Sequence, residues 1–315
     1  MPPRSPLPPR HGLGAAWVRT PDRAAGPPQW ATMGAWLRHK LPDRVDVDWL
    51  LAEERFVGED GRPVRDDDPY RPHTFVWFHR DLRDEVTVPG AIEVLHRDER
   101  LVVVDKPPFL ATIPRGRHVA QSVVVLLRDE LGLPELSPVH RLDRVTSGVL
   151  VLATERRWRG AYQGLFQRRE VTKTYLAVAG HDPVLELPVV VRNHIRKVAG
   201  ELQAEVIPDA PVNAETLVEL QDVRDGRGVY RLTPRTGRTH QLRLHLAGLG
   251  VPIVGDPLYP EVLDVAVDDF STPVQLLAHQ LSFTDPVDGS PRTFTSRRAL
   301  PLVAEPGASP VSDLR

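Results

Sequence analysis

Asp143 is the first residue whose type and setting suggest chemistry, because it lies between two arginines, Arg141 and Arg144. It belongs to residues 140–148, which read H-R-L-D-R-V-T-S-G and lead into an apolar run over 149–153. Neighbouring guanidinium groups favour the ionised form of a carboxylate. An ionised aspartate at the start of a buried strand is suited to nucleophilic or general-base work. A second interpretation stays open, in which the aspartate and its arginines only close a turn.

Lys173 and Tyr175 form a second polar pair, two residues apart in an alternating stretch over 172–179. In a strand they project from the same face. A cation beside a phenol on one face is typical of a tyrosine that touches a polar ligand. A tyrosine at the edge of an apolar core would give the same pattern.

The third candidate group lies in residues 235–249. Leucines at helical spacing predict a helix over 239–249, on which His240 and Arg243 are neighbours at i and i+3 beside the leucine stripe. The preceding R-T-G-R turn ends at Arg238 and leads into the first turn of this helix, where free backbone N–H groups favour an anion.

The scaffold for these residues is predicted to be of the α+β class, with a mixed, largely antiparallel central sheet and flanking helices. Strands and helices alternate without the regular βαβ order of a parallel sheet. Helices are expected over 32–41, near Trp49, and over 122–131, 156–169 and 239–249. Strands are expected over 74–78, 92–95, 101–105, 149–153, 172–179, 189–191, 214–220, 229–233, 276–283 and 292–296.

The 315 residues divide by composition into four parts. Residues 1–30 read as a flexible Pro/Arg-rich arm, and 31–88 as a small unit of two short helices and a hairpin. Residues 89–300 form the main domain, and 301–315 a tail.

Several classes of function are excluded by composition and motif. The chain has no cysteine, which removes disulfide frameworks, thiolate metal centres and thiol nucleophiles. It has no glycine-rich phosphate loop. His240 and His245, at i and i+5, face different sides of their helix, so no metal site is expected. There is neither a transmembrane run nor a secretory h-region near the first residues, so we expect a cytoplasmic protein.

Charge is segregated along the chain although the formal net charge is only -2. Residues 43–68 and 261–288 each carry -6, whereas 155–173 carries +4 and both 192–197 and 235–243 carry +3. If the three basic segments converge on one face, that face could hold a polyanion backbone. Three separate solvated surfaces remain the alternative.

Three long segments resemble the signatures of the RluA-type pseudouridine synthases. They read H-R-L-D-R-V-T-S-G-V-L-V-L-A, R-R-E-V-T-K-T-Y-L-A-V and R-T-G-R-T-H-Q-L-R-L-H-L-A-G-L-G-V-P-I-V-G-D-P-L-Y. The earlier V-V-V-D-K-P-P-F-L is similar as well. Order and spacing match over about residues 90–300, roughly two-thirds of the chain.

The resemblance implies roles for individual residues. Asp143 falls on the family's catalytic aspartate, Tyr175 on its active-site tyrosine and Arg243 on the arginine that pairs with the aspartate. Arg141 matches the side chain that fills the stack when the target uridine flips out. Leu277 matches an apolar residue that packs on the base. We also expect RNA contacts from Arg144, Lys173, Arg238 and His240.

The implied reaction converts uridine in rRNA or tRNA into pseudouridine, with no cofactor and no metal, in a protein expected to be a monomer. Asp143 would attack the sugar, remove a proton to give a glycal, or attack ring carbon six. Two alternatives stay open: a non-catalytic RNA-binding or RNA-chaperone protein on the same scaffold, and an Asp-dependent hydrolase of small nucleosides.

Two features depart from the family's pattern. Pro260 follows Tyr259 where relatives often have glycine, which leaves the shape of that loop open. The unit over 31–88 occupies the place of a small RNA-binding domain in relatives, yet its segment 43–68 is acidic. It is either a degenerate or repurposed RNA-binding domain or a purely structural extension.

Overall fold

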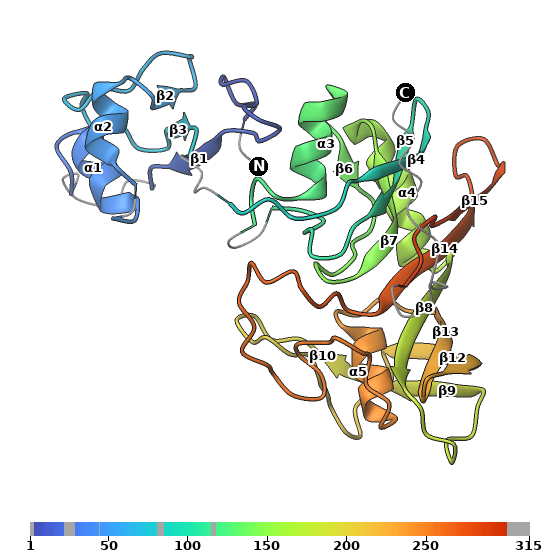
Figure 1. The fold of residues 1–315 in the computed structure, drawn as a ribbon. Coiled ribbons are helices and arrows are strands. Elements are labelled where there is room, and N and C mark those ends of the chain that lie inside the picture. Colours follow the sequence, from blue (N-terminus) through green and yellow to red (C-terminus); the bar gives the residue numbers. More distant parts are fainter. Residues whose placement is uncertain (1–2, 22–28, 44, 81–84, 115–117, 301–315) are drawn as a thin grey trace. The chain divides into compact units, whose positions relative to one another are not determined.

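The computed structural model describes residues 3–21, 29–43, 45–80, 85–114 and 118–300. The chain forms two compact units, one of Met1–Glu85 with Val125–Pro134 and the other of Val86–Val124 with Glu135–Arg315 (Figure 1). The predicted tail over 301–315 lies outside the described residues. The helices of the described part include none long and apolar enough to cross a membrane.

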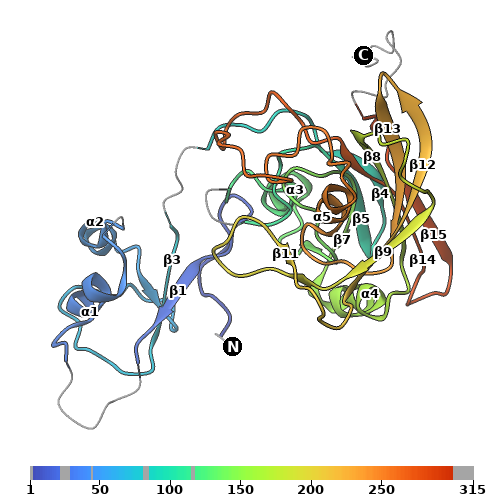
Figure 2. The ribbon, with the colours of Figure 1, turned by 90° about the horizontal axis from the view of Figure 1, so that it is seen from below.

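The N-terminal unit contains a three-stranded antiparallel sheet and two short helices, which lie on one side of that sheet in both views (Figures 1 and 2). Most of α3 (Val123–Leu131) belongs to this unit as well. The strand order is β1-β3-β2. The elements are β1 (Ala16–Arg19), α1 (Met33–Lys40), α2 (Val47–Ala52), β2 (Val57–Gly58) and β3 (Phe75–Phe78).

Local sequence explains both helices of this unit. The Thr32 side chain accepts a hydrogen bond from the N–H of Ala35 and caps α1, and the Asp46 side chain caps α2 in the same way. Trp36 and Leu37 are buried in a core shared with β3. The expected helices and the strand over 74–78 are therefore confirmed.

Strand β1 corrects the prediction of a loose arm over 1–30. Ala16–Arg19 pairs antiparallel with Phe75–Phe78. Four alternating residues surrounded by proline and glycine are too short a signal alone, and the pairing partner lies more than fifty residues away.

The second unit contains a ten-stranded sheet with strand order β4-β5-β7-β14-β8-β13-β12-β9, onto which β6 and β15 are paired. Neighbouring strands are antiparallel except β7 and β14, which are parallel, so the predicted α+β class is confirmed. Its strands are β4 (Glu93–Arg97), β5 (Leu101–Lys106), β6 (Ser137–Pro138), β7 (Ser147–Ala153), β8 (Thr172–Gly180), β9 (Val189–Asn193), β12 (Ala214–Arg224), β13 (Arg227–Pro234), β14 (Leu276–Thr284) and β15 (Pro291–Thr295). A separate small hairpin comprises β10 (Ile195–Arg196) and β11 (Glu205–Val206), and the helices of this unit are α4 (Arg156–Arg168) and α5 (Gln241–Gly248).

Helices α4 and α5 cover the same face of the large sheet. Val171, just before β8, packs in the cluster that contains the apolar side of α4. Tyr175 and Ala177 of β8 pack with the leucines of α5. Alternate residues of a strand share a face, so the stretch of β8 around Lys173 lies between the two helices.

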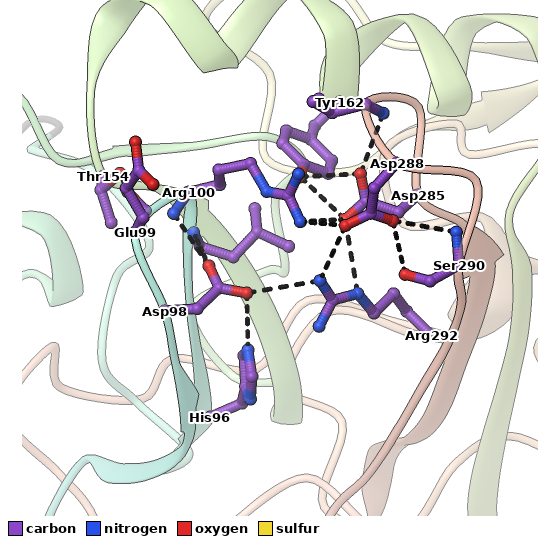
Figure 3. A network of polar contacts seen from close by, with 12 residues as sticks. His96, Asp98, Glu99, Arg100, Thr154, Tyr162, Asp285, Asp288, Ser290 and Arg292 are labelled. Atoms are coloured by element: carbon purple, nitrogen blue, oxygen red, sulfur yellow. Dashed lines mark hydrogen bonds and ion pairs between the residues drawn. The ribbon is translucent and has the colours of Figure 1, made fainter.

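A network of charged side chains, called the clasp below, ties together one end of this unit (Figure 3). Asp285, whose side chain is fully buried, accepts a hydrogen bond from the Tyr162 hydroxyl of α4 (3.0 Å) and lies 3.5 Å from Arg100 and 3.4 Å from Arg292. Asp98 lies 3.5 Å from Arg292 and accepts from the N–H of Arg100. The clasp therefore joins the β4–β5 turn, α4 and the β14–β15 turn.

Candidate active site

An open cavity with about 510 Å³ of empty space lies on the helix-covered face, between β8 and α5. Leu276 of β14 contributes to its wall. The cavity brings together predicted residues from all three motif segments. Those that line it are Arg141, Asp143, Lys173, Tyr175, Arg238, His240 and Arg243.

Arg243 of α5 is held between two carboxylates. Its Nη1 lies 3.5 Å from Asp143 Oδ2, while its Nε and Nη2 donate to Asp256 at 2.7 and 2.6 Å. Burial alone would lower the pKa of Arg243, but the hydrogen bonds and charge of Asp256, with the charge of Asp143, raise it above its usual value. The guanidinium therefore stays charged at the cavity floor.

The two carboxylates differ in how much of them is available. The Asp256 side chain is 1% exposed and also accepts the N–H groups of Leu258 and Tyr259. The Asp143 side chain is 29% exposed, and among the described residues it has only the ion pair with Arg243. Asp143 is thus the carboxylate that a ligand can reach.

Asp256 was not among the residues predicted for the site. Its sequence signal is the G-D-P-L-Y stretch at the end of the third motif segment. Nothing in that stretch shows that the carboxylate turns inward to a helix thirteen residues earlier, which only the fold brings about.

A buried lysine, Lys106, holds the loop that carries Asp143 through hydrogen bonds to backbone carbonyls. The ammonium of Lys106, a fully buried residue, donates to three backbone carbonyls, those of Pro107 (2.9 Å), Leu110 (2.8 Å) and Arg144 (3.1 Å). Burial lowers the pKa of Lys106 to about 7, and the Asp143 carboxylate opposes that shift. A catalytic side chain on a loop needs such support to hold its geometry.

His140 fixes the start of the same loop. Its ring stacks on Phe166 of α4 with centroids 4.6 Å apart, and its Nε2 accepts the N–H of Val151 at 3.1 Å. Burial, with the Lys173 charge nearby, lowers the pKa of His140 to about 3. The imidazole is therefore neutral at neutral pH and acts as an anchor.

Lys173 and Tyr175 project into the cavity from one face of β8, as their spacing predicts. Lys173 Nζ donates to the carbonyl of Thr236 at 3.0 Å, and burial lowers its pKa to about 8. Burial and the Asp143 charge raise the pKa of the Tyr175 phenol. A neutral phenol beside an accessible carboxylate presents a flat surface on which a base can pack.

His240 corrects the predicted start of the helix over 239–249. It has a left-handed backbone (φ 59°) and precedes α5, which begins at Gln241. The His240 Nδ1 lies 3.0 Å from the Tyr259 hydroxyl, which also bonds the backbone of Ala204. His240 therefore lines the cavity from a turn and not from a helix face.

Two predicted residues do not reach the cavity. The Arg144 guanidinium donates to the carbonyl of Val267 at 3.3 Å and lies over the Phe109 ring. Leu277 packs in a cluster on the other face of the sheet, and its neighbour Leu276 lines the cavity instead. Two adjacent leucines in a strand face opposite ways, and the sequence does not tell which one faces inward.

Arg141 and Arg238 are exposed side chains at the cavity wall. Arg238 Nε donates to the carbonyl of Asn213 at 3.2 Å, so that side chain has a fixed direction. The described residues include no group of three or more His, Cys, Asp and Glu side chains that could hold a metal ion.

Comparison with known proteins agrees with the geometry. Residues 100–248 match the family model described as RNA pseudouridylate synthase. The dual-specificity RNA pseudouridine synthase RluA of Yersinia pestis is 35% identical over 211 residues, 64% of this chain and 96% of the relative. The mitochondrial tRNA pseudouridine(32) synthase of Saccharomyces cerevisiae is 32% identical over 58% of this chain and 40% of its own.

A solved structure gives the same fold. Human RNA pseudouridylate synthase domain containing 1 superimposes with a TM-score of 0.53 and 26% identity, over 67% of this chain and 86% of that one. The sequence match spans nearly the whole length of the Yersinia pestis enzyme, and its motif segments meet at one cavity. The chain therefore belongs to the RluA-type family of RNA pseudouridine synthases, and the enzyme activity predicted from its motifs is confirmed.

Proposed function

We propose that this enzyme isomerises specific uridines of rRNA or tRNA, with Asp143 acting on a uridine flipped out into the cavity. The observation that carries the proposal is a reachable carboxylate held against a buried, permanently charged Arg243. An ionised carboxylate is what all three chemical routes require: attack on the anomeric carbon, proton removal to a glycal, or attack on ring carbon six.

The remaining side chains then have defined tasks. Tyr175 packs against the uracil and helps to remove the proton on carbon five, a step for which its phenol must first give up its own proton. Arg141 fills the gap left in the RNA stack. Lys173, Arg238 and His240 contact the flipped nucleotide or its neighbours from the cavity wall.

The finer assignments are also proposals. Residues 89–300 act as the catalytic domain, with 31–88 as an appended unit. The protein works as a monomer in the cytoplasm, without a metal or cofactor. Breaking the glycosidic bond, turning the base and rejoining it through carbon are redox-neutral steps, so the reaction itself needs neither.

The test is tritium release from uridine labelled at carbon five, carried in bulk tRNA and separately in rRNA. We expect release from at least one pool with the wild type and none with Asp143→Asn or Asp143→Ala. Asp222→Asn is the matched control, because Asp222 is an exposed aspartate of β12 paired with Arg224.

The two outcomes separate the candidate functions. Full release by Asp143→Asn would overturn the proposed mechanism. Absence of release from both pools in the wild type, with salt-sensitive RNA binding retained, would favour the non-catalytic RNA-binding protein instead.

A further inference from the structure

The N-terminal unit carries a row of aromatic rings on the face of its sheet opposite the helices. Cross-strand pairing sets Trp17 of β1 opposite Trp77 of β3, and Arg19 opposite Phe75. These four side chains therefore share one face. The alternate residues of the same strands belong to the core with α1 and α2.

Neighbouring rings of the row are in contact, and Trp17 at one end of the row is exposed to solvent. The Trp17 and Phe75 ring centroids lie 5.3 Å apart, and those of Phe75 and Trp77 lie 5.6 Å apart. The Arg19 guanidinium lies 5.7 Å from the Phe75 ring centroid. Trp77 is 1% exposed, whereas Trp17 is 46% exposed. A partly exposed aromatic ring beside a guanidinium, as at the Trp17 end of this row, is the arrangement on which unpaired bases stack.

Basic and acidic residues of this unit lie in different segments, and the basic ones contain the strands that carry the aromatic row. Residues 3–21 and 69–80, which contain β1 and β3, carry arginines and no acidic residue. In the described part of the chain, four of these arginines are exposed and form no ion pair, namely Arg4, Arg10, Arg71 and Arg80. Within the acidic segment 43–68, Asp48 and Asp66 both pair with Arg38 of α1.

The acidic segment also marks one border of the aromatic face. Glu59 follows β2 and accepts a hydrogen bond from the backbone N–H of Phe75 at 3.3 Å. A polyanion that lies on Trp17 therefore has Arg19 on its own strand and an acidic border beyond Phe75. This distribution of charge favours an RNA strand that lies along β1.

We propose that Trp17, Arg19 and Phe75 form a stacking platform for an unpaired stretch of the RNA substrate, with the flanking arginines contacting its phosphates. The proposal rests on the RNA-modifying function above and gives the enzyme a second RNA contact, within the N-terminal unit alone. It accounts for an appended unit whose net charge by itself would not attract RNA.

The test uses the full-length protein and a labelled single-stranded oligoadenylate of about 12 nucleotides, a length that suits one stacking site. Oligoadenylate contains no uridine, so the probe is not a substrate of the cavity. We expect Trp17→Ala and Phe75→Leu each to weaken binding about tenfold. Arg19→Gln should lower the slope of log Kd against log salt concentration by about one phosphate contact.

Trp49→Ala is the matched control. Trp49 of α2 is 42% exposed and has the Arg55 guanidinium 4.5 Å from its ring centroid, but it lies in the acidic segment. Its substitution should leave the affinity for oligoadenylate unchanged. Equal binding by Trp17→Ala and Trp49→Ala would overturn the platform, and would point to a protein partner for this face.

Failure of the platform and failure of the proposed function give different results. If the platform is right, Trp17→Ala raises KM for tritium release from RNA and leaves kcat unchanged. If the wild type releases no tritium while Trp17→Ala still weakens oligoadenylate binding, the platform stands and the catalytic assignment falls. Should circular dichroism show that Trp17→Ala alters the fold, the exposed Arg19→Gln decides, because an unchanged salt slope would refute the platform.

Discussion

The two carboxylates that pair with Arg243 differ in burial, so the same Asp→Asn substitution should affect the protein differently at each position. Asp256→Asn removes a charge from a pair in which both side chains are at most 2% exposed. Asp143→Asn removes a charge from a side chain that is 29% exposed. We expect the first substitution to act on folding, with secondary damage to catalysis, and the second to act on catalysis alone.

The magnitude follows from burial. Breaking a buried, hydrogen-bonded ion pair by removing one partner costs about 3–5 kcal/mol. Asn keeps one oxygen for the N–H groups of Leu258 and Tyr259, so we expect the lower end for Asp256→Asn, about 3 kcal/mol. In a folding unit of this size that lowers Tm by roughly 6–12 °C. Asp143→Asn should cost less than about 1 kcal/mol, as for other partly exposed pairs.

The assay combines thermal unfolding with tritium release at 25 °C. Asp256→Asn should show the large drop in Tm and a reduced kcat, because Arg243 is then free to turn fully toward Asp143. Asp143→Asn should keep the wild-type Tm and release no tritium. An unchanged Tm for Asp256→Asn, or equal losses of Tm for both variants, would refute the division of roles between the carboxylates.

Three further predictions concern the surroundings of the site. The pKa of His140 is lowered to about 3 by burial, whereas the unfolded histidine takes up a proton near its ordinary value of 6.5. The free energy of unfolding should therefore fall as pH drops below about 6.5, by about 2 kcal/mol at pH 5. Urea unfolding should show a weaker pH dependence of this free energy for His140→Gln than for the wild type, and an identical pH dependence would contradict the role given to His140. Asp285→Asn in the clasp should lower the free energy of unfolding by about 3 kcal/mol with kcat unchanged at 25 °C, measured by urea unfolding and tritium release; a lost kcat in folded protein would show that the clasp also shapes the site. Leu276→Ala should raise KM or lower kcat for RNA because Leu276 lines the cavity, whereas Leu277→Ala should cost only stability, about 2–5 kcal/mol. The reverse pattern would support the contact between Leu277 and the base that the family resemblance implies.

Much of the catalytic fold could be predicted because its signals are local. The strand at β7 is a continuous apolar run, and all seven of its residues are buried. The face shared by Lys173 and Tyr175 follows from strand periodicity, which needs no knowledge of the partner strands. The three motif segments supplied most of the residues that line the cavity, since each segment is an intact stretch of sequence.

The failures all concern relations that no single stretch contains. The left-handed turn at His240 shifts the start of α5, and leucine spacing does not report φ angles. Leu276 and Leu277 are both apolar, so only the neighbouring strands decide which one faces the cavity. Asp256 becomes part of the site because its loop returns to α5, a contact between separate elements.

The N-terminal unit shows the same limit for charge. A sum over 43–68 describes a surface of acidic side chains, several of which pair with arginines of that unit. It says nothing of Trp17 and Arg19, which lie outside the summed segment and join the unit through strand pairing with β3. Net charge predicts long-range attraction to RNA, but stacking depends on which rings the pairing leaves accessible. An acidic unit can therefore still bind an unpaired base on one basic face, and the ring of Trp17 is where that contact should be sought.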